Sequence, residues 1–286
     1  MDFDSIVLRD ALMRRIRAFF YECGFTEVET PLRIETPCLE LHIDAEPSGD
    51  HFLRTSPEMF HKQLLAAGHE KIFEVGKCFR QGEFGPLHHP EYTMLEWYRA
   101  NADYMDMLEE TTALVARVWP EASTSWRVLA VSDAFREFAG WDPAGSYDAD
   151  RFDIDLVEKV EPALKELGGP VVLIDYPIEA AALARRKPDH PLVAERWELY
   201  IDGIELANAY SELTDPVEQR RRFEECADQR KALGKEVYPI DEGFLQALAR
   251  MPPSGGVALG VDRLLMLAAG ENSLDAMIPF RSPAGR

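Results

Sequence analysis

The sequence has no long apolar run and little cysteine. No stretch of about 18 apolar residues occurs, which argues against a membrane-spanning helix. The first twenty residues include aspartates and arginines, so they lack the apolar centre of a signal peptide. The four cysteines form no C-x-x-C pair, and neither a zinc knuckle nor a disulfide framework is indicated. We therefore expect a cytoplasmic protein with reduced thiols.

Positive charge is also scarce. Lysine and arginine number 31 against 51 aspartates and glutamates, which gives a net charge of -20. This balance disfavours a broad nucleic-acid surface, because each phosphate contact needs a cation. Hydrophobic residues make up 46% of the 286 residues, enough for a substantial core. Because no repeat or linker is visible, we predict one domain over residues 1–286.

Several common nucleotide and hydrolase motifs are missing. The sequence contains no G-x-x-x-x-G-K-[ST] phosphate loop, no G-x-G-x-x-G turn and no G-x-S-x-G nucleophile elbow. His88 and His89 are adjacent, but neighbouring side chains point apart, so the pair alone does not indicate a metal site.

Two segments with a period of two predict a pair of antiparallel strands. They are "KIFEVGKCFR", residues 71–80, and "YTMLEWYR", residues 92–99. Their apolar residues alternate with polar ones, as expected for strands that bury one face. The long polar loop between them favours antiparallel pairing. The side chains expected to share the opposite face are those of Arg80, Tyr92, Glu96 and Tyr98.

A hairpin is predicted in "WELYIDGIELANAYSEL", with Asp202-Gly203 in a type I′ turn. Glu205, Asn208 and Glu212 follow it at intervals of three and four, which a regular strand cannot place on one face. Either a β-bulge interrupts the strand or the segment leaves the sheet after Asn208, and we favour the bulge. "GGVALGVDRLLMLAAG" predicts a glycine-rich strand that leads into an apolar helix.

Carboxylates and isolated arginines recur in four of these segments. Taken singly, a charged strand residue most simply belongs to a solvated face. Their coincidence favours a site for substrates of opposite sign, such as a cationic amino acid beside a polyphosphate whose charge is carried by arginine and Mg²⁺. The residues are Glu96, Glu198, Glu205 and Glu212 with Arg80 and Arg263, and Glu58 joins them from the predicted helix "SPEMFHKQLLAAG", residues 56–68.

Three stretches resemble the signature motifs of class II aminoacyl-tRNA synthetases of the lysyl subgroup: "FTEVETP", "FRQGEF…HHPEYTMLEW" and "GVALGVDR". The stand-alone paralogues that modify elongation factor P resemble the chain most continuously, through "RTSPE", "HPEYTMLEWYR", "GIELANAYSELTD" and "SGGVALGVDRLLMLA". The resemblance implies an α+β catalytic domain with an antiparallel sheet of six or seven strands flanked by helices, and a homodimer. The anticodon-reading OB-fold of lysyl-tRNA synthetases is not expected, so stable tRNA binding is not expected either.

By this resemblance the chain is an ATP-dependent ligase. It would activate (R)-β-lysine or lysine as an adenylate and transfer it to a lysine side chain of elongation factor P. Two alternatives remain open. One is a free-standing lysine-activating enzyme that loads another carrier or an RNA, and the other is a catalytically silent, synthetase-like regulatory subunit.

The resemblance also implies roles for individual residues. Arg80, Glu205 and Arg263 would be catalytic, and Glu198 and Glu205 would hold Mg²⁺. The implied ATP-binding residues are Arg80, Gly82, His88, His89, Tyr92, Glu205, Leu206, Gly260 and Arg263. The implied residues for the amino acid are Ser56, Pro57, Glu58, Glu96, Tyr98, Asn208, Glu212 and Ala258.

Three positions refine the comparison with that family. Lysyl-tRNA synthetases usually carry alanine at the position of Ser56 and glycine at that of Ala258, whereas the elongation factor P enzymes carry serine and alanine, as here. An added hydroxyl and an added methyl together suit an amino group on the β carbon. The family motif of arginine, any residue, then glutamate is not kept, because Gly82 stands two places after Arg80 and Glu83 follows.

Overall fold

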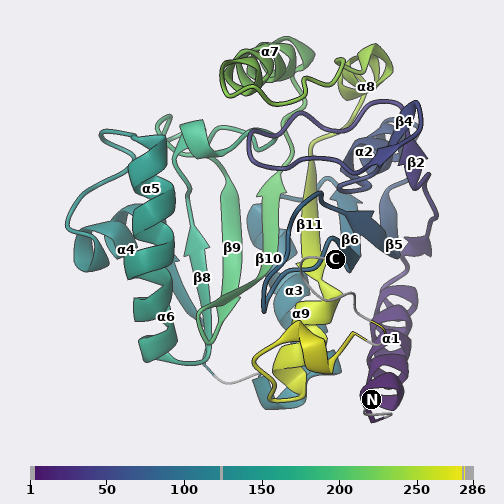
Figure 1. The fold of residues 1–286 in the computed structure, drawn as a ribbon, viewed down its shortest axis with the longest axis vertical. Coiled ribbons are helices and arrows are strands. Elements are labelled where there is room, and N and C mark those ends of the chain that lie inside the picture. The colour runs from purple at the N-terminus through teal and green to yellow at the C-terminus, as the bar shows by residue number, and fades with distance from the viewer. Residues whose placement is uncertain (1–3, 123–124, 279, 281–286) are drawn as a thin grey trace. The chain divides into compact units, whose positions relative to one another are not determined.

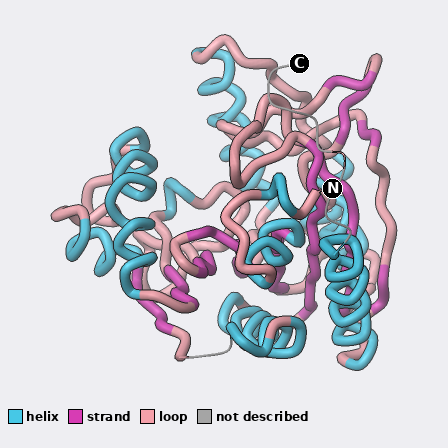
Figure 2. Tube along the Cα trace, turned by 60° about the horizontal axis from the view of Figure 1, so that its bottom comes forward, coloured by secondary structure: helices cyan, strands magenta, loops and turns pink. Residues whose placement is uncertain are grey.

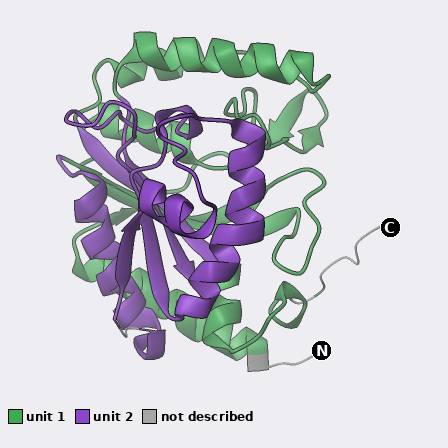
Figure 3. Ribbon diagram, turned by 90° about the vertical axis from the view of Figure 1, so that its left-hand side faces the viewer, with its two compact units in different colours: residues 1–100, 214–252, 259–286 green, residues 101–213, 253–258 purple. Residues whose placement is uncertain are grey.

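The computed structural model describes residues 4–122, 125–278 and 280 (Figure 1). The chain divides into two compact units (Figure 3). Unit 1 holds the described parts of residues 1–100, 214–252 and 259–286, and unit 2 those of residues 101–213 and 253–258. A single domain over the whole chain stays a prediction.

The strands form one mixed sheet of eight strands and a small sheet of three. Unit 1 contributes β1-β5-β6 in that order and the three-stranded sheet β2-β4-β3, and unit 2 contributes β11-β10-β9-β8-β7. The α+β class is therefore confirmed, but the expected count of six or seven strands is too low. The outermost strands β1 and β7 are short and pair in parallel with β5 and β8, whereas the other pairs named below are antiparallel.

The helices and strands are joined by loops of varied length (Figure 2). In unit 1 the elements are α1 (Asp4–Glu22), β1 (Thr26–Glu27), β2 (Arg33–Ile34), β3 (Pro47–Ser48), β4 (His51–Leu53), α2 (Glu58–Ala66), β5 (Lys71–Phe79), β6 (Glu91–Ala100), α7 (Pro216–Ala232), α8 (Glu242–Leu248), α9 (Val261–Ala268) and a 3-10 turn, η4 (Leu274–Ala276). In unit 2 they are α3 (Tyr104–Val118), η1 (Pro120–Ala122), β7 (Arg127–Ala130), α4 (Val131–Phe138), α5 (Ala149–Asp155), a π-helical turn η2 (Leu156–Val160), α6 (Glu161–Leu167), β8 (Pro170–Ile174), η3 (Ile178–Ala180), β9 (Arg196–Ile201) and β10 (Ile204–Ser211); β11 (Ser254–Gly260) begins there.

The antiparallel β5–β6 pair confirms the period-two prediction. Its register places Phe73 beside Trp97 and Val75 beside Leu95 on the apolar face. Phe73 stacks on Phe20 of α1 with ring centroids 4.6 Å apart, and the Trp97 ring lies 5.3 Å from Phe20. Phe20, Phe73 and Trp97 are fully buried. Burial of these rings fixes the strand pair against α1 and commits its other face to polar side chains.

The β9–β10 hairpin of unit 2 also follows the prediction. Asp202 and Gly203 have φ values of 52° and 75°, both positive as a type I′ turn requires. The register then shifts between Glu205 and Ala207, which confirms the bulge. Because of this extra residue, Asn208 lies on the same face of the strand as Glu205.

No helix among the residues that the structure describes is long and apolar enough to span a bilayer.

Candidate active site

Two glutamates lie directly opposite each other on the polar face of the β5–β6 pair. Glu74 of β5 is the cross-strand partner of Glu96 of β6. Their exposed fractions are only 4% and 1%. Like charges in this arrangement destabilise a sheet, and burial increases the cost. The structure must therefore compensate at least one of the two carboxylates.

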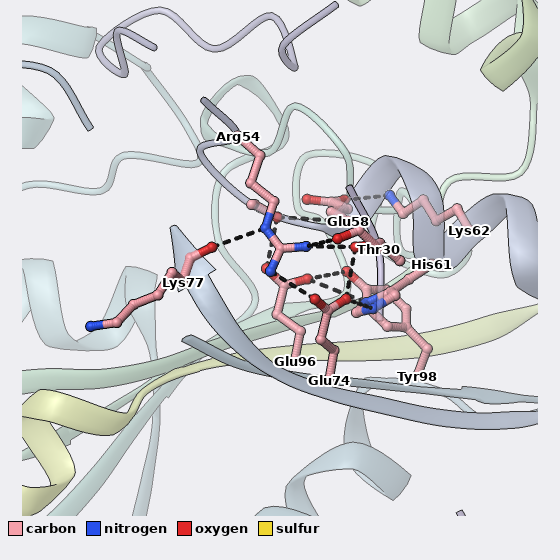
Figure 4. Close-up of polar contacts among 10 residues, drawn as sticks. Thr30, Arg54, Glu58, His61, Lys62, Glu74, Lys77, Glu96 and Tyr98 are labelled. Carbon is pink, nitrogen blue, oxygen red and sulfur yellow. Dashed lines mark hydrogen bonds and ion pairs between the residues drawn. The ribbon is translucent and has the colours of Figure 1, made fainter. Parts of the chain in front are cut away.

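Arg54 compensates Glu74 (Figure 4). Its side chain is fully buried, and one guanidinium nitrogen lies 2.7 Å from Glu74 Oε1. The guanidinium also donates to the Thr30 hydroxyl at 2.6 Å and to the Lys77 carbonyl at 3.0 Å. Thr30 Oγ1 in turn donates to Glu74 Oε2 at 2.7 Å. Both oxygens of Glu74 therefore have donors that stabilise the ionised carboxylate.

Gly76 of β5 leaves the space that Arg54 occupies. A Cβ at this position would lie 2.2 Å from an Arg54 guanidinium nitrogen and 2.9 Å from Glu74 Oε1. We expect Gly76→Ala to displace the guanidinium and to lower the free energy of unfolding by about 1–3 kcal/mol in urea titrations. Gly145→Ala is the matched control, because its nearest neighbour would be Asp142 Oδ2 at 3.7 Å. Equal, small effects of both substitutions would contradict the packing argument.

Glu96 is held by hydroxyl groups. Ser56 donates to Glu96 Oε1 at 2.7 Å, and the Tyr98 hydroxyl donates to Oε2 at 3.0 Å. Burial, reinforced by the nearby charge of Glu58, raises the pKa of Glu96 to about 8. Glu96 is therefore mostly protonated at neutral pH in the structure as it stands. The side chains implied for the amino acid, Ser56, Glu96 and Tyr98, do lie together.

Helix α2 supplies the remaining members of this cluster. The N-cap of α2 is Pro57. The Glu58 amide donates a hydrogen bond to the Ser56 hydroxyl at 3.0 Å. Lys62 Nζ lies 2.5 Å from Glu58 Oε1, one helical turn away. His61 lies between the strand glutamates, with Nε2 3.1 Å from Glu74 Oε2 and Nδ1 3.8 Å from Glu96 Oε2.

The two strand glutamates should have opposite effects on stability as pH changes. Burial opposes ionisation of Glu74, but hydrogen bonds from His61 and Arg54 outweigh it and lower the pKa to about 2. Its contribution is present above the usual pKa of 4.5 and is lost as pH falls through about 2. The pKa of Glu96 is raised, so its contribution is full below 4.5 and is lost as pH rises through about 8.

Glu96→Gln should therefore flatten the fall in unfolding free energy between about pH 4.5 and pH 8. Urea denaturation at a series of pH values measures the slope. Glu91→Gln, on the same strand but exposed, should keep the wild-type slope. If the Glu96→Gln protein shows the wild-type slope as well, Glu96 does not titrate in this range.

A second group in unit 1 gathers the cations implied for ATP. The Arg80 guanidinium lies 5.2 Å from the centroid of the Tyr92 ring and 3.7 Å from Glu83 Oε1. Arg263, in the first turn of α9, contacts His88 Nε2 at 2.8 Å. Burial, and after it the charges of Arg263 and Arg80, lower the pKa of His88. These effects place His88 in a cationic environment, as a phosphate site requires.

The loop between β5 and β6 takes a tight course after Arg80. Gly82 has a φ of 77°, a conformation that favours glycine, and this explains why glutamate is absent at that position. His89 is fixed by its Nδ1 contact with the Glu91 carbonyl at 2.6 Å. Gly260, the N-cap of α9, has no neighbour closer than 3.8 Å to the place of a Cβ. A side chain at position 260 would therefore meet only ordinary contacts with the Arg263 side chain.

Sequence reasoning missed the residues that fix Arg263. Arg9 of α1 lies 2.5 Å from Asp262 Oδ1 and donates to the Thr93 hydroxyl at 2.6 Å. The Thr93 amide donates to Asp262 Oδ2 at 2.6 Å. Contacts from α1 and β6 thus hold Asp262 in place. They also fix the backbone from which the neighbouring Arg263 side chain extends.

In unit 2, Glu198 is surrounded by donors. Tyr176 and Tyr200 donate to Oε2 at 2.5 and 2.6 Å, and Arg196 donates to Oε1 at 2.5 Å. Burial raises the pKa of Glu198, against the opposing effect of Arg196, and the charge of Glu205 adds to the rise. Glu198 and Glu205 therefore lie close enough to repel each other.

The other implied residues of unit 2 follow the bulged strand. Leu206 is buried at the bulge, and Asn208 Oδ1 accepts from Arg196 at 3.2 Å. Glu212 is 1% exposed, just beyond β10, and its amide donates to the Ser254 carbonyl at 2.8 Å. Ala258 is half-buried on β11. That these residues meet those of unit 1 at one substrate stays a prediction.

Comparison with known proteins agrees with this chemistry. A model of the class II tRNA synthetases (D, K and N) matches residues 3–283, and the chain belongs to this family. Among curated relatives, the elongation factor P–(R)-beta-lysine ligases of Proteus mirabilis and Erwinia tasmaniensis are 37% and 38% identical, over 96% of this chain and 94% of each relative. The lysine–tRNA ligase of Moorella thermoacetica is 36% identical over 96% of this chain, which spans only 64% of that relative.

Proposed function

We propose that this chain is an ATP-dependent elongation factor P–(R)-β-lysine ligase. It activates the amino acid as an adenylate and transfers it to a lysine side chain of the factor. Near full-length similarity to ligases with this name supports the proposal. The observation that carries it is the buried cluster of Glu58, Glu74 and Glu96, whose permanent cations among the described residues are Arg54 and Lys62. Three carboxylates beside two permanent cations leave a place for one more positive charge, which is either the proton on Glu96 or an ammonium group.

In the first step, formation of the adenylate, different residues of unit 1 bind different groups of the substrates. Glu96, oriented by Ser56 and Tyr98, binds an ammonium group of the amino acid. Arg80 binds the substrate carboxylate and the α-phosphate, where negative charge develops as the carboxylate attacks and pyrophosphate leaves. The substrate carboxylate is itself the nucleophile of this step, so positioning and charge compensation supply the catalysis.

Arg263, Tyr92 and His88 bind the nucleotide. The planar guanidinium of Arg263 stacks on adenine, and Tyr92 covers the other face. In the structure the Tyr92 hydroxyl donates to the Thr55 carbonyl at 2.8 Å, so its ring is fixed in advance. His88 then contacts the outer phosphate.

Mg²⁺ fits the donor set of unit 2 with one restriction. Glu205 and Glu198 are close, and two carboxylates together with phosphates are a usual magnesium environment. Both Glu198 oxygens already accept hydrogen bonds, and Oε2 accepts two, so Oε1 is the atom with acceptor capacity left. Glu205 and Glu198 Oε1 would therefore hold the ion, which supplies charge neutralisation on the phosphates when bound.

The proposal extends to the assembly and the acceptor. We infer a homodimer formed through α1, whose Val7 and Tyr21 are exposed apolar side chains at 69% and 55%. We also infer that the chain forms no stable complex with tRNA and acts in the cytoplasm. The net charge of -20 supports a protein acceptor over an RNA.

Isotope exchange between ATP and pyrophosphate tests the activation step. We expect (R)-β-lysine to support exchange, α-lysine to support it more weakly, and norleucine, which lacks the distal ammonium, to support none. Exchange with α-lysine alone would favour the free-standing lysine activator. No exchange with any amino acid would overturn the proposal and favour a silent regulatory subunit.

A further inference from the structure

The charged cluster of unit 1 has an asymmetry that the reaction alone does not explain. Glu74 pairs with Arg54 at 2.7 Å, and Glu58 pairs with Lys62 at 2.5 Å. Glu96 has hydroxyl donors from Ser56 and Tyr98, and its one basic neighbour within 4 Å among the described residues is the His61 ring at 3.8 Å. Both permanent cations of the cluster are thus directed at other carboxylates.

His61 links the two strand glutamates, and its tautomer can be assigned from them. Because Glu74 is ionised, the ring nitrogen 3.1 Å from it, Nε2, carries the hydrogen. Burial lowers the pKa of His61, so the ring is neutral at pH 7 and Nδ1 is left with a lone pair. That atom is fully buried, has no hydrogen-bond partner among the described residues, and faces Glu96 Oε2. A lone pair at this point disfavours the ionised form of Glu96.

The other groups around Glu96 within unit 1 do not reverse this effect. Cys78 of β5 and Tyr92 of β6 are neutral, since burial raises the pKa of the thiol to about 12 and raises the pKa of the phenol. Glu58 adds a like charge, whereas the hydrogen bonds from Ser56 and Tyr98 and the charge of Arg54 favour the ionised form without outweighing burial. The titratable and charged groups that face Glu96 or its partners are therefore Arg54 before α2, Glu58, His61 and Lys62 on α2, Glu74 and Cys78 on β5, and Tyr92 and Tyr98 on β6.

We propose that Glu74 and His61 are positioning residues that keep Glu96 in its protonated form until the ammonium group of the amino acid replaces that proton. Amine binding is then an exchange. The Glu96 carboxylic acid loses its proton to solvent, and the resulting carboxylate pairs with the incoming ammonium group. The buried cluster stays close to neutral before and after binding, which avoids the cost of an uncompensated buried charge.

This device also provides specificity, and it rests on the proposed function. A neutral side chain bound beside Glu96 would leave Glu96 protonated and would gain no ion pair. A cationic side chain gains an ion pair with Glu96, and Glu96 gives up one proton to solvent. Affinity for the amine should therefore rise as pH rises through the range in which Glu96 titrates.

Calorimetric titration of the full chain with (R)-β-lysine, without ATP, tests the exchange. Repeating it in buffers of different ionisation enthalpy gives the number of protons released. For a folded pKa of about 8 we expect close to one proton per amine at pH 7 and roughly a quarter at pH 8.5. Glu96→Gln should release none, and Glu91→Gln, on the same strand and exposed, should release as many as the wild type.

A pair of variants tests the positioning residues themselves. Glu74→Gln removes the charge opposite Glu96 and should at least halve the release at pH 7. Thr30→Val removes a hydrogen bond to Glu74 but keeps its charge, so it should leave the release near the wild-type value. Equal release by both variants would overturn the positioning role. If Glu74→Gln does not fold, the wild-type pH series decides.

The titration distinguishes failure of the proton exchange from failure of amine binding. Binding of the amine with no proton released at pH 7 would overturn the exchange and leave the proposed ligase function standing. Absence of any amine binding would overturn both.

Discussion

Replacing Arg80 with alanine is expected to lower the rate of amino-acid-dependent exchange between ATP and pyrophosphate about 10³-fold. Arg80 is half-buried on the strand end beside Tyr92, where its guanidinium is already oriented by the ring 5.2 Å away. The charge it provides is needed most when the carboxylate attacks the α-phosphate. Arg80→Lys should recover only part of the rate, because an ammonium group cannot make the two parallel hydrogen bonds of a guanidinium.

Arg33→Ala is the control for this experiment. Arg33 belongs to the same unit, but its side chain is 48% exposed and pairs with the surface residue Asp50 at 2.5 Å. Its loss should leave the exchange rate within about twofold of the wild type. A similar rate for Arg80→Ala and Arg33→Ala would show that Arg80 does not act on the reacting groups.

Replacing Arg54 with alanine is expected to have the largest effect on stability, about 3–5 kcal/mol in the free energy of unfolding. The substitution leaves Glu74 ionised, 4% exposed and directly opposite Glu96, while removing its guanidinium partner. Urea denaturation at pH 7 measures the loss. Arg33→Ala, which breaks an exposed ion pair, should cost no more than about 1 kcal/mol.

A double substitution separates loss of the pair from loss of packing. The double variant Arg54→Ala, Glu74→Gln has no uncompensated carboxylate at position 74. The losses in unfolding free energy of the two single variants should therefore not add. We expect the double variant to be more stable than the sum of the single losses predicts, by at least about 1 kcal/mol. Strict additivity would mean that the charge of Glu74 is not what makes Arg54 necessary.

Local sequence signals were sufficient to predict the strands that bury one face. Alternation in residues 71–80 and 92–99 predicted the β5–β6 pair, and Asp202-Gly203 predicted the turn of the β9–β10 hairpin. The interval between Glu205 and Asn208 predicted the bulge. These features depend on neighbours within a few residues, where side-chain period and φ preference dominate.

The edge strands and the support of the site could not be predicted in the same way. β1 has two residues and β7 has two exposed positions, so neither shows an alternating pattern. Arg54, His61 and Glu74 lie on three different segments, and each alone resembles a surface residue. One signal was present. Gly76 within an otherwise regular strand indicates that another group approaches closely, and that group is Arg54.

The buried network changes how the acidic residues of the site are understood. From the sequence, Glu58 and Glu96 were equivalent members of an acidic face. In the structure Glu58 has Lys62 as its partner, whereas Glu96 is held by hydroxyl groups and lies opposite a second carboxylate. Ser56, which the resemblance linked to β-lysine, donates directly to Glu96. The serine therefore acts directly on the carboxylate of Glu96.

Intact-mass spectrometry of elongation factor P after incubation with the protein, ATP and (R)-β-lysine tests the central claim most directly. We predict that the factor gains the mass of one β-lysyl group, that the gain requires ATP, and that it is lost when the acceptor lysine of the factor is replaced by arginine. Parallel reactions with lysine tRNA in place of the factor should yield no aminoacylated RNA. An unmodified factor together with charged tRNA would contradict the account.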